Sequence, residues 1–600
     1  MPTAAPPRPA RKRAQPVRHP PARRFRVPDP KRRLEAILIL SLIVLSLIAG
    51  RLVQLQGLDR STYAAMAERQ RLHTVALTAP RGEIVDRDGR PLAETVDARD
   101  VYADPTKVTD PLVEAQQLAP VLGLPVRALR DQLSKKTTFV YLSRAVTPAL
   151  AGQVMQLEMP GTGRPALPGI GVLPTSKRLY PATTLASNLV GFVNADGDGV
   201  SGLEASYDKL LAGRDGERTF ETGLSGSPIP DGQDVVRPAL AGTGVQLTID
   251  RDIQWEAQQA IAAQVHAVHA DSGTVIVMDP RTGRLLAMAV APGFDPNHYY
   301  DYPLSALNDP AVSDVYEPGS VNKVITMSAA LQERLLTPRS PFVVPPQLHY
   351  AGFTFHDAEV HGTEHLTLAG ILAKSSNIGT IEVARQVGAA RLYHYLRAYG
   401  FGAATGVGLP DDGQGLLPPL SQWTPSTLPT VSFGQGVGVT AIQVASVYAT
   451  IANGGVRVTP QLVAGTIDAD GRRHASPAPR QHRVISARVA GQLRDMLEAV
   501  TTTEGTAPLA RISGYRIAGK TGTANRSTKY GYSGYTSSFV GFGPADKPQL
   551  LVEVVLQNPR SGHFGGLVAA PVFHRVMSFA LQTLKIPPTG TRPPKVKTTW

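Results

Sequence analysis

The chain has 600 residues, of which 42% are hydrophobic and 18% charged, and it carries a formal net charge of +13 without any cysteine. This length predicts several domains with apolar cores, and the composition excludes a disordered or collagen-like chain. The lack of cysteine excludes disulfide bonds, cysteine-ligated metals and a cysteine nucleophile, so catalytic chemistry must use oxygen and nitrogen groups.

The positive charge is concentrated at the two ends of the chain. Residues 1–33 hold eleven Lys and Arg residues against one Asp, and Arg592, Lys595 and Lys597 lie near the other end. The chain between these ends is neutral overall, so no basic surface for nucleic acid is indicated and we expect no nucleic-acid partner.

An apolar segment follows the basic residues directly. Residues 36–50 contain no charged side chain, and the run extends over 34–55 if Glu35 and Arg51 reach the membrane boundaries. We predict a single membrane anchor over 34–55, a basic cytoplasmic tail over 1–33, and the rest of the chain on the opposite side of the membrane. A cleaved signal peptide is the alternative, but no small-x-small site closes the segment.

Two regions follow the anchor, with a boundary predicted near residue 241. From 56 to 240, short strand-like runs alternate with Gly, Pro and Asp turns. From 241 to 585, strands and helices are more densely mixed. The Pro- and Lys-rich residues 586–600 are predicted to be a disordered tail.

Several elements are predicted inside the second region. Residues 274–278 and 285–289 flank an Asp-Pro-Arg-Thr-Gly-Arg turn and predict a β-hairpin. A helix is predicted over 321–336. Neighbouring strands are predicted at 515–517, 537–540 and 549–556.

Three short motifs stand in order in this region: Ser320-Val321-Asn322-Lys323, Ser375-Ser376-Asn377 and Lys520-Thr521-Gly522-Thr523. A lone Ser-x-x-Lys is weak evidence, because a serine N-cap followed by an exposed lysine has the same spacing. The ordered set is the signature of penicillin-binding proteins and serine β-lactamases.

The spacing of the first motif indicates a nucleophile and its base. A helix that starts at Ser320 places Lys323 on the same face, where a neutral amine could take the proton of the hydroxyl. Burial, the helix N-terminus and the second cation Lys520 would each disfavour the ammonium form of Lys323.

The other two motifs indicate groups that handle the substrate. Ser375 is expected to relay a proton to the leaving amine, and Asn377 to hold the substrate amide. On a strand, Gly522 would let the substrate backbone approach, while the hydroxyls of Thr521 and Thr523 bind a terminal carboxylate and backbone N–H groups meet the oxyanion.

The sequence around these motifs resembles that of the monofunctional class B penicillin-binding proteins, over residues 34–585. The resemblance near the motifs lies in Tyr316–Lys323, Lys374–Asn377, Phe433–Gly436 and Gly519–Ala524, and Arg81–Gly89 and Gly202–Glu204 resemble the family's pedestal. It implies an α+β multidomain fold. A single N-terminal transmembrane helix would be followed by an elongated β-rich pedestal (dimerisation-type) domain over 56–240 and a transpeptidase domain over 241–585, with an antiparallel sheet flanked by helices.

The resemblance also implies a reaction. Ser320 would attack the D-Ala-D-Ala bond of a peptidoglycan stem peptide, release D-alanine and pass the acyl group to an acceptor amine, and β-lactams would acylate the same serine. Residues 378–519 contain no E-x-x-L-N segment of the kind that supports rapid hydrolysis in class A β-lactamases. No metal and no organic cofactor are implied. Residues 194–199 resemble the start of a calcium-binding loop but are interpreted as a Gly/Asp turn. His361 and His365 have the spacing of metal ligands on a helix but are interpreted as polar loop residues.

The amino-acid sequence around Ser320 and Ser375 most resembles that of the division-specific, septal member of the family. This implies a single-pass protein of the bacterial plasma membrane. Its expected partners are peptidoglycan stem peptides, lipid-linked glycan strands, a glycosyltransferase of the SEDS type and divisome proteins. An elongation-specific transpeptidase, a D,D-carboxypeptidase and a non-catalytic scaffold or β-lactam receptor remain as alternatives.

Overall fold

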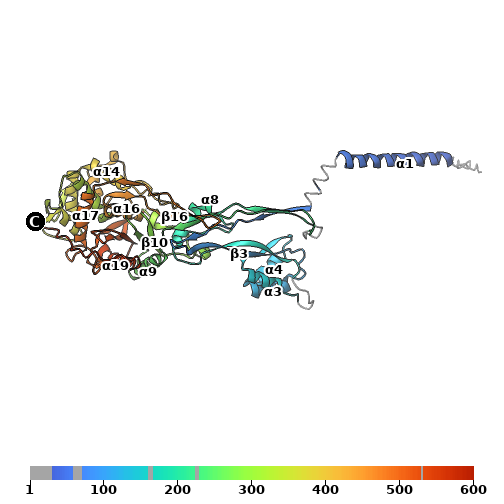
Figure 1. Cartoon of the computed structure of the whole chain (residues 1–600), viewed down its shortest axis with the longest axis horizontal. Coiled ribbons are helices and arrows are strands. Elements are labelled where there is room, and N and C mark those ends of the chain that lie inside the picture. The colour runs from blue at the N-terminus through green and yellow to red at the C-terminus, as the bar shows by residue number, and fades with distance from the viewer. Residues whose placement is uncertain (1–29, 59–65, 67–70, 160–166, 223–228, 529–530) are drawn as a thin grey trace, which may run out of the picture. The chain divides into compact units, whose positions relative to one another are not determined.

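The computed structural model describes residues 30–58, 66, 71–159, 167–222, 229–528 and 531–600 (Figure 1). It divides into two compact units, residues 1–75 with 218–236, and residues 76–217 with 237–600. Most of the basic tail predicted over 1–33 lies outside the described residues.

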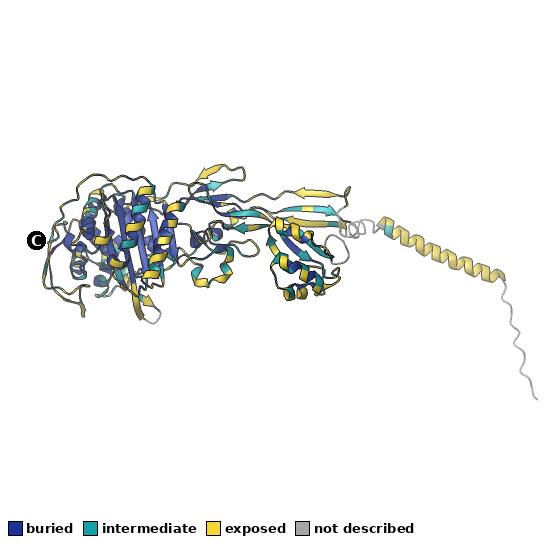
Figure 2. Cartoon of the chain, turned by 90° about the horizontal axis from the view of Figure 1, so that it is seen from below, coloured by how far each residue is buried: buried dark blue, intermediate teal, exposed yellow. Residues whose placement is uncertain are grey.

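The first unit contains helix α1 (Pro30–Val53) and the helical turn η1 (Gln54–Leu58). None of the side chains of α1 is buried (Figure 2), and within the described part of the chain Pro30–Gly57 is the one helix long and apolar enough to cross a membrane. An apolar helix with no protein packed around it fits a lipid environment, which is consistent with a single membrane anchor. The unit also holds most of a sheet of strands β1 (Leu72–Leu77), β6 (Gly216–Glu221) and β7 (Asp234–Arg237).

The first part of the second unit is built on a long mixed sheet in the order β17-β16-β8-β2-β3-β4, with β5 also paired to β3. Helices α3, α4 and α5 pack against β3, β4 and β5 around a core that includes Val101, Leu118 and Leu129. The elements are β2 (Ile84–Val85), β3 (Pro91–Ala103), α3 (Pro111–Leu122), α4 (Val126–Leu133), β4 (Val140–Val146), α5 (Pro148–Met155), β5 (Ile170–Leu179), α6 (Ser187–Val190), α7 (Gly202–Ser206), α8 (Asp208–Leu211), β8 (Gly244–Leu247), β16 (Val463–Ile467) and β17 (Arg473–Ala475).

The second part is organised around a five-stranded antiparallel sheet in the order β10-β9-β21-β20-β19. The hairpin predicted from the sequence is confirmed as β9 and β10. The strands are β9 (Ser272–Met278), β10 (Leu285–Ala291), β19 (Ala518–Thr528), β20 (Gly531–Gly543) and β21 (Leu550–Gln557).

Both faces of this sheet are covered by helices, as Figure 2 shows by its buried colour. Val275 and Val277 belong to the core shared with helices α9 (Arg251–Ala267) and α19 (Ala570–Thr583). Their neighbours Ile276 and Met278 belong to the opposite core, with α11 (Lys323–Gln332) and α16 (Ala441–Ala452). Because successive strand residues point to opposite faces, a strand buried on both sides reads as a continuous apolar run.

The remaining elements surround this sheet. They are α10 (Pro310–Ser313), η4 (Gly319–Asn322), β11 (Pro341–Val344), β12 (Leu348–Tyr350), β13 (Phe353–Phe355), β14 (Glu364–Thr367), α12 (Leu368–Lys374), α13 (Asn377–Val387), α14 (Ala389–Tyr399), α15 (Thr427–Ser432), β15 (Val456–Val458), β18 (Gln481–Arg483), α17 (Ala487–Glu498) and α18 (Gly565–Val568), with short 3₁₀ turns at Pro296–Asp301, Leu304–Ala306, Leu420–Gln422, Ala499–Thr501 and Pro508–Ala510.

Two predictions about secondary-structure elements need correction. Residues 515–517 are not a strand, because β19 begins at Ala518. The helix predicted over 321–336 is a 3₁₀ turn that continues as α11 and ends at Gln332.

The predicted disorder of residues 586–600 is also wrong. The Thr367 N–H donates to the Thr598 carbonyl at 3.0 Å, and Thr599 forms an antiparallel bridge with Leu366. Composition alone predicted disorder because few residues of this segment are apolar, whereas the pairing depends on a strand more than 200 positions earlier.

Candidate active site

Ser320 lies in the η4 turn that leads directly into α11. Gly319, which precedes it, has a positive φ of 58° and donates its N–H to the Gly434 carbonyl at 3.0 Å. Ser320 is half-buried, and its hydroxyl has no hydrogen-bond partner among the described residues. The turn is therefore fixed by its backbone while the hydroxyl stays available to a substrate.

Lys323 is the first residue of α11 and is completely buried. Its Nζ donates to the Ser375 carbonyl at 2.5 Å, to Asn377 Oδ1 at 2.7 Å and to Ser375 Oγ at 3.3 Å. Burial lowers the pKa of Lys323 to about 7, although the Asp357 carboxylate acts in the opposite direction. A large fraction of this amine is therefore neutral at neutral pH and able to accept a proton.

Lys520 on β19 is the second completely buried amine of the site. Its Nζ donates to Ser375 Oγ at 2.8 Å, to the Thr521 carbonyl at 3.1 Å and to Thr521 Oγ1 at 3.2 Å. Burial and the nearby Lys323 cation hold the pKa of Lys520 well below its ordinary value. The three motifs thus meet at one atom, Ser375 Oγ, which contacts both amines.

The second motif lies at the junction of two helices. Ser375 is the C-cap of α12 with a left-handed φ of 62°, and Ser376 is the N-cap of α13, whose Oγ accepts the Gly379 N–H at 2.9 Å. Asn377 uses its side-chain amide inside the protein, since Oδ1 accepts from Lys323 and Nδ2 donates to the His356 carbonyl at 3.0 Å. The amide keeps a second N–H and a second acceptor position, so Asn377 can hold a substrate amide, as the sequence predicted, without losing either contact.

Asp357 is a residue of the site that the sequence analysis did not identify. Its Oδ1 accepts the N–H groups of Asn377 at 2.5 Å and Ile378 at 3.0 Å, and its Oδ2 lies 3.0 Å from His361 Nε2. A carboxylate at the start of α13 satisfies N–H groups that have no partner within the helix. Asp357 lies in a loop without a recognisable motif, so no local signal marked it.

The third motif lies on β19, the edge strand of the five-stranded sheet. The Thr521 hydroxyl shares a hydrogen bond of 2.8 Å with the Thr506 hydroxyl, and Thr523 Oγ1 accepts the Gly565 N–H at 3.1 Å. A β-carbon at Gly522 would overlap Ser538 Oγ and crowd Val321 of the η4 turn. Gly522 is therefore required by packing, and the free edge of β19 can accept an extended peptide as an added strand.

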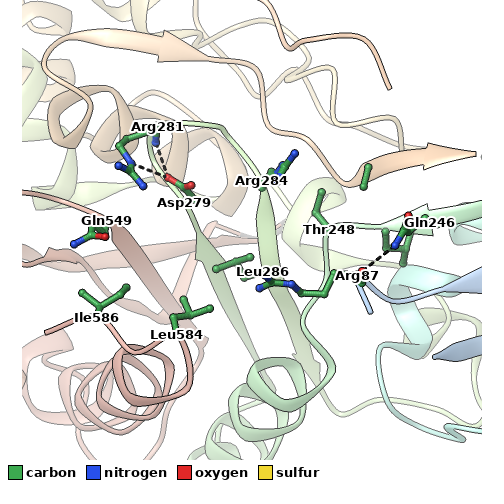
Figure 3. A pocket seen from close by; sticks show the side chains of 12 residues that line it. Arg87, Gln246, Thr248, Asp279, Arg281, Arg284, Leu286, Gln549, Leu584 and Ile586 are labelled. Atoms are coloured by element: carbon green, nitrogen blue, oxygen red, sulfur yellow. Dashed lines mark hydrogen bonds and ion pairs between the residues drawn. The ribbon is translucent and has the colours of Figure 1, made fainter. Parts of the chain in front are cut away.

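Among the described residues, no group of three or more His, Asp or Glu side chains could hold a metal ion. A cavity of about 400 Å³ lies elsewhere in the second unit (Figure 3). It is lined by residues outside the three motifs, among them Arg87, Thr248, Arg281, Arg284 and Leu286.

Comparison with known proteins gives consistent matches over most of the chain. Residues 273–578 match the penicillin-binding protein transpeptidase domain, and residues 76–247 match the penicillin-binding protein dimerisation domain. The chain is 36% identical over 580 residues to penicillin-binding protein PbpB of Mycobacterium tuberculosis, covering 91% of this chain and 84% of that protein. It is 33% identical over 561 residues to peptidoglycan D,D-transpeptidase FtsI of Escherichia coli, covering 91% of each.

A solved structure matches as well. The crystal structure of penicillin-binding protein 3 from M. tuberculosis in complex with aztreonam aligns with a TM-score of 0.69 at 32% identity, covering 88% of this chain and 100% of that chain.

Proposed function

Because the chain belongs to the class B penicillin-binding proteins and is a serine-type peptidoglycan D,D-transpeptidase that β-lactams target, we propose that Ser320 is its nucleophile and that it cross-links stem peptides in septal cell-wall synthesis. The single observation that supports the assignment of the site is the meeting of Lys323 and Lys520 on Ser375 Oγ, because Lys323 follows Ser320 by three residues across the junction of η4 and α11.

The proposed acylation step starts from neutral Lys323. Ser320 Oγ attacks the carbonyl carbon of the D-Ala-D-Ala bond while its proton passes to Lys323 Nζ, and the tetrahedral oxyanion is met by backbone N–H groups. The C–N bond then breaks, and the released D-alanine amine takes a proton through Ser375. The product is an ester between Ser320 and the stem peptide.

Transfer of the acyl group completes the cycle. The acceptor amine attacks the ester, gives up a proton to the lysine, and restores the Ser320 hydroxyl as the cross-link forms. The hydroxyls of Thr521 and Thr523 would bind the terminal carboxylate of the donor peptide, which pairs along the edge of β19, and Asn377 would hold its amide. In a β-lactam the leaving amine stays tethered, so we expect the acyl-enzyme to persist.

The cellular assignment rests on different support. The sequence around Ser320 and Ser375 resembles the division-specific members of the family, and α1 supplies a single helix that fits a plasma-membrane anchor with a cytoplasmic N-terminus. We propose a SEDS-type glycosyltransferase and divisome proteins as partners, and peptidoglycan stem peptides on lipid-linked glycan strands as substrates.

Covalent labelling tests the proposed nucleophile. The detergent-solubilised full chain and its Ser320→Ala variant are incubated with a fluorescent penicillin, and the label is followed over time. We expect a stable adduct on the wild type and none on a folded Ser320→Ala variant. Labelling that survives this substitution contradicts the assignment of Ser320, and rapid loss of label contradicts a transpeptidase that deacylates slowly.

Depletion in cells tests the septal assignment. Cells that lose a septal transpeptidase should elongate without dividing, and Ser320→Ala should fail to restore division. Rounded cells would instead point to the elongation-specific alternative. Restoration by Ser320→Ala would identify a scaffold whose hydroxyl is dispensable.

A further inference from the structure

Residues 596–600, called the strap below, pair with the free edge of β14. The Thr367 N–H donates to the Thr598 carbonyl at 3.0 Å, the Trp600 N–H donates to the His365 carbonyl at 3.3 Å, and Thr599 bridges Leu366 in antiparallel fashion. The other edge of β14 pairs with β11. The strap therefore gives β14 a neighbour on both sides.

Side chains hold the strap at two further points. The Trp600 ring packs edge-on against His365 with centroids 5.0 Å apart, and its Nε1–H donates to the Phe342 carbonyl at 3.2 Å. Val596 packs against the main hydrophobic core. These contacts join the strap to both strands of the small sheet.

Gly370 lets the strap approach helix α12. A β-carbon at this position would overlap the carbonyl oxygen of Thr598, so every other residue type would push the strap away from the first turn of the helix. The φ of Gly370 is not positive, so this glycine is needed for the close approach of the strap backbone and not for a left-handed conformation.

The strap also holds the N-cap of α12. Thr367 Oγ1 accepts the Gly370 N–H at 3.0 Å and donates its own proton to the Lys597 carbonyl at 2.6 Å. The opposite end of this seven-residue helix is Ser375, its C-cap. One short, rigid helix of about 10 Å thus connects the strap to the hydroxyl shared by Lys323 and Lys520.

We propose that the strap is a positioning element for acylation, which fixes α12 through Thr367 and thereby holds Ser375 Oγ against the two lysines. The inference rests on the proposed role of Ser375. Without the strap, the Thr367 hydroxyl loses its acceptor and the β14 edge opens, so α12 can shift. Small displacements of a group that transfers a proton lower the rate without abolishing the reaction.

Deletion and rescue in trans test the proposal. The full chain is compared with a variant that ends at Pro593, and the acylation rate constant with fluorescent penicillin is measured together with the thermal unfolding midpoint. We expect acylation of the shortened protein to slow about three- to tenfold while its final extent of labelling is unchanged. A peptide with the sequence of residues 594–600 should restore the rate, and the reversed sequence should not.

Point variants separate positioning from general stability. Thr367→Val should slow acylation as the deletion does, and Thr367→Ser, which keeps the hydroxyl, should restore it. Lys597→Ala is the matched control, because this exposed side chain can be removed while the carbonyl that Thr367 uses remains. Gly370→Ala introduced into the shortened protein should prevent rescue by the peptide.

Three results would overturn the proposal: a wild-type rate after deletion, equal rescue by the reversed peptide, or rescue that persists with Gly370→Ala. If the shortened protein does not fold, a wild-type rate in Thr367→Val overturns it. Failure of the proposed function gives a different result, because fluorescent penicillin would then still label the Ser320→Ala variant, whether the strap is present or deleted.

Discussion

At the scale of single residues, the charge state of Lys323 decides how the site works. Its amine is buried, and burial lowers its pKa to about 7, so near neutral pH both forms are populated. Only the neutral amine can take the Ser320 proton. We therefore predict that the acylation rate constant rises about tenfold per pH unit below pH 7 and levels off above it.

The measurement is the rate of labelling by a fluorescent penicillin between pH 5 and 9, with the thermal midpoint recorded at each pH. Lys323→Arg is the control, because an arginine stays protonated and should abolish acylation at every pH. A flat profile in the wild type would contradict a lysine base. Folding stability should also rise with pH between about 7 and 10.5, since in that range the unfolded chain binds the proton that the folded chain has released.

At the scale of elements, Asp357 couples the start of α13 to the lysine. It accepts two N–H groups of the helix and counteracts the lowering of the Lys323 pKa. We predict that Asp357→Asn lowers the Lys323 pKa further, so the acid limb of the acylation profile moves to lower pH. Loss of the charged cap should also lower the free energy of unfolding by about 1 kcal/mol.

The check is the acylation profile of Asp357→Asn beside that of Glu359→Gln, which removes an exposed carboxylate from the same loop. The control should reproduce the wild-type profile. A shift of the Asp357→Asn limb to higher pH would show that the carboxylate does not act on Lys323 as the geometry indicates.

The elements also show what the sequence could and could not reveal. The β9–β10 hairpin and the three motifs are local patterns, and the confirmed hairpin depends on apolar runs around a turn. Asp357 and the strap act across the fold, on partners about 20 and more than 200 positions away. A single sequence carries no signal for such pairings, which is why composition suggested disorder for a segment that the structure orders.

The structure also modifies how the motif residues are connected. The sequence predicted that the Lys323 amine reaches the Ser320 hydroxyl, because residues three apart share a helix face. In the structure, the hydrogen bonds of Lys323 go to Ser375 and Asn377. Helical spacing predicts proximity, but which acceptor a buried amine selects depends on the neighbouring helices α12 and α13.

At the scale of the whole molecule, a buried ionic network connects segments of the second unit that precede the catalytic region. Glu204 is fully buried and accepts from Arg81 Nε at 2.6 Å and from Arg178 Nε at 2.7 Å, while Arg81 Nη1 reaches Asp208 at 2.8 Å. Tyr180 donates its hydroxyl to the same Glu204 carboxylate at 3.4 Å. Glu204 therefore pairs with two guanidinium groups that are almost entirely removed from water, and Asp208 is a second anion for Arg81.

We predict that Glu204→Ala destabilises the protein severely, by about 3–5 kcal/mol, because it leaves the buried Arg178 guanidinium without its anion and Arg81 with Asp208 alone. The matched control is Glu217→Ala, which removes an ion pair of 2.7 Å with Arg237 on the exposed surface and should cost at most about 1 kcal/mol. Thermal and urea unfolding of the detergent-solubilised chain measure both. Below its lowered unfolding temperature, Glu204→Ala should acylate at the wild-type rate, since Glu204 belongs to none of the three motifs. Equal losses of stability in the two variants would show that burial of the network adds nothing, and a slower acylation at full folding would show that the network also acts on the catalytic site.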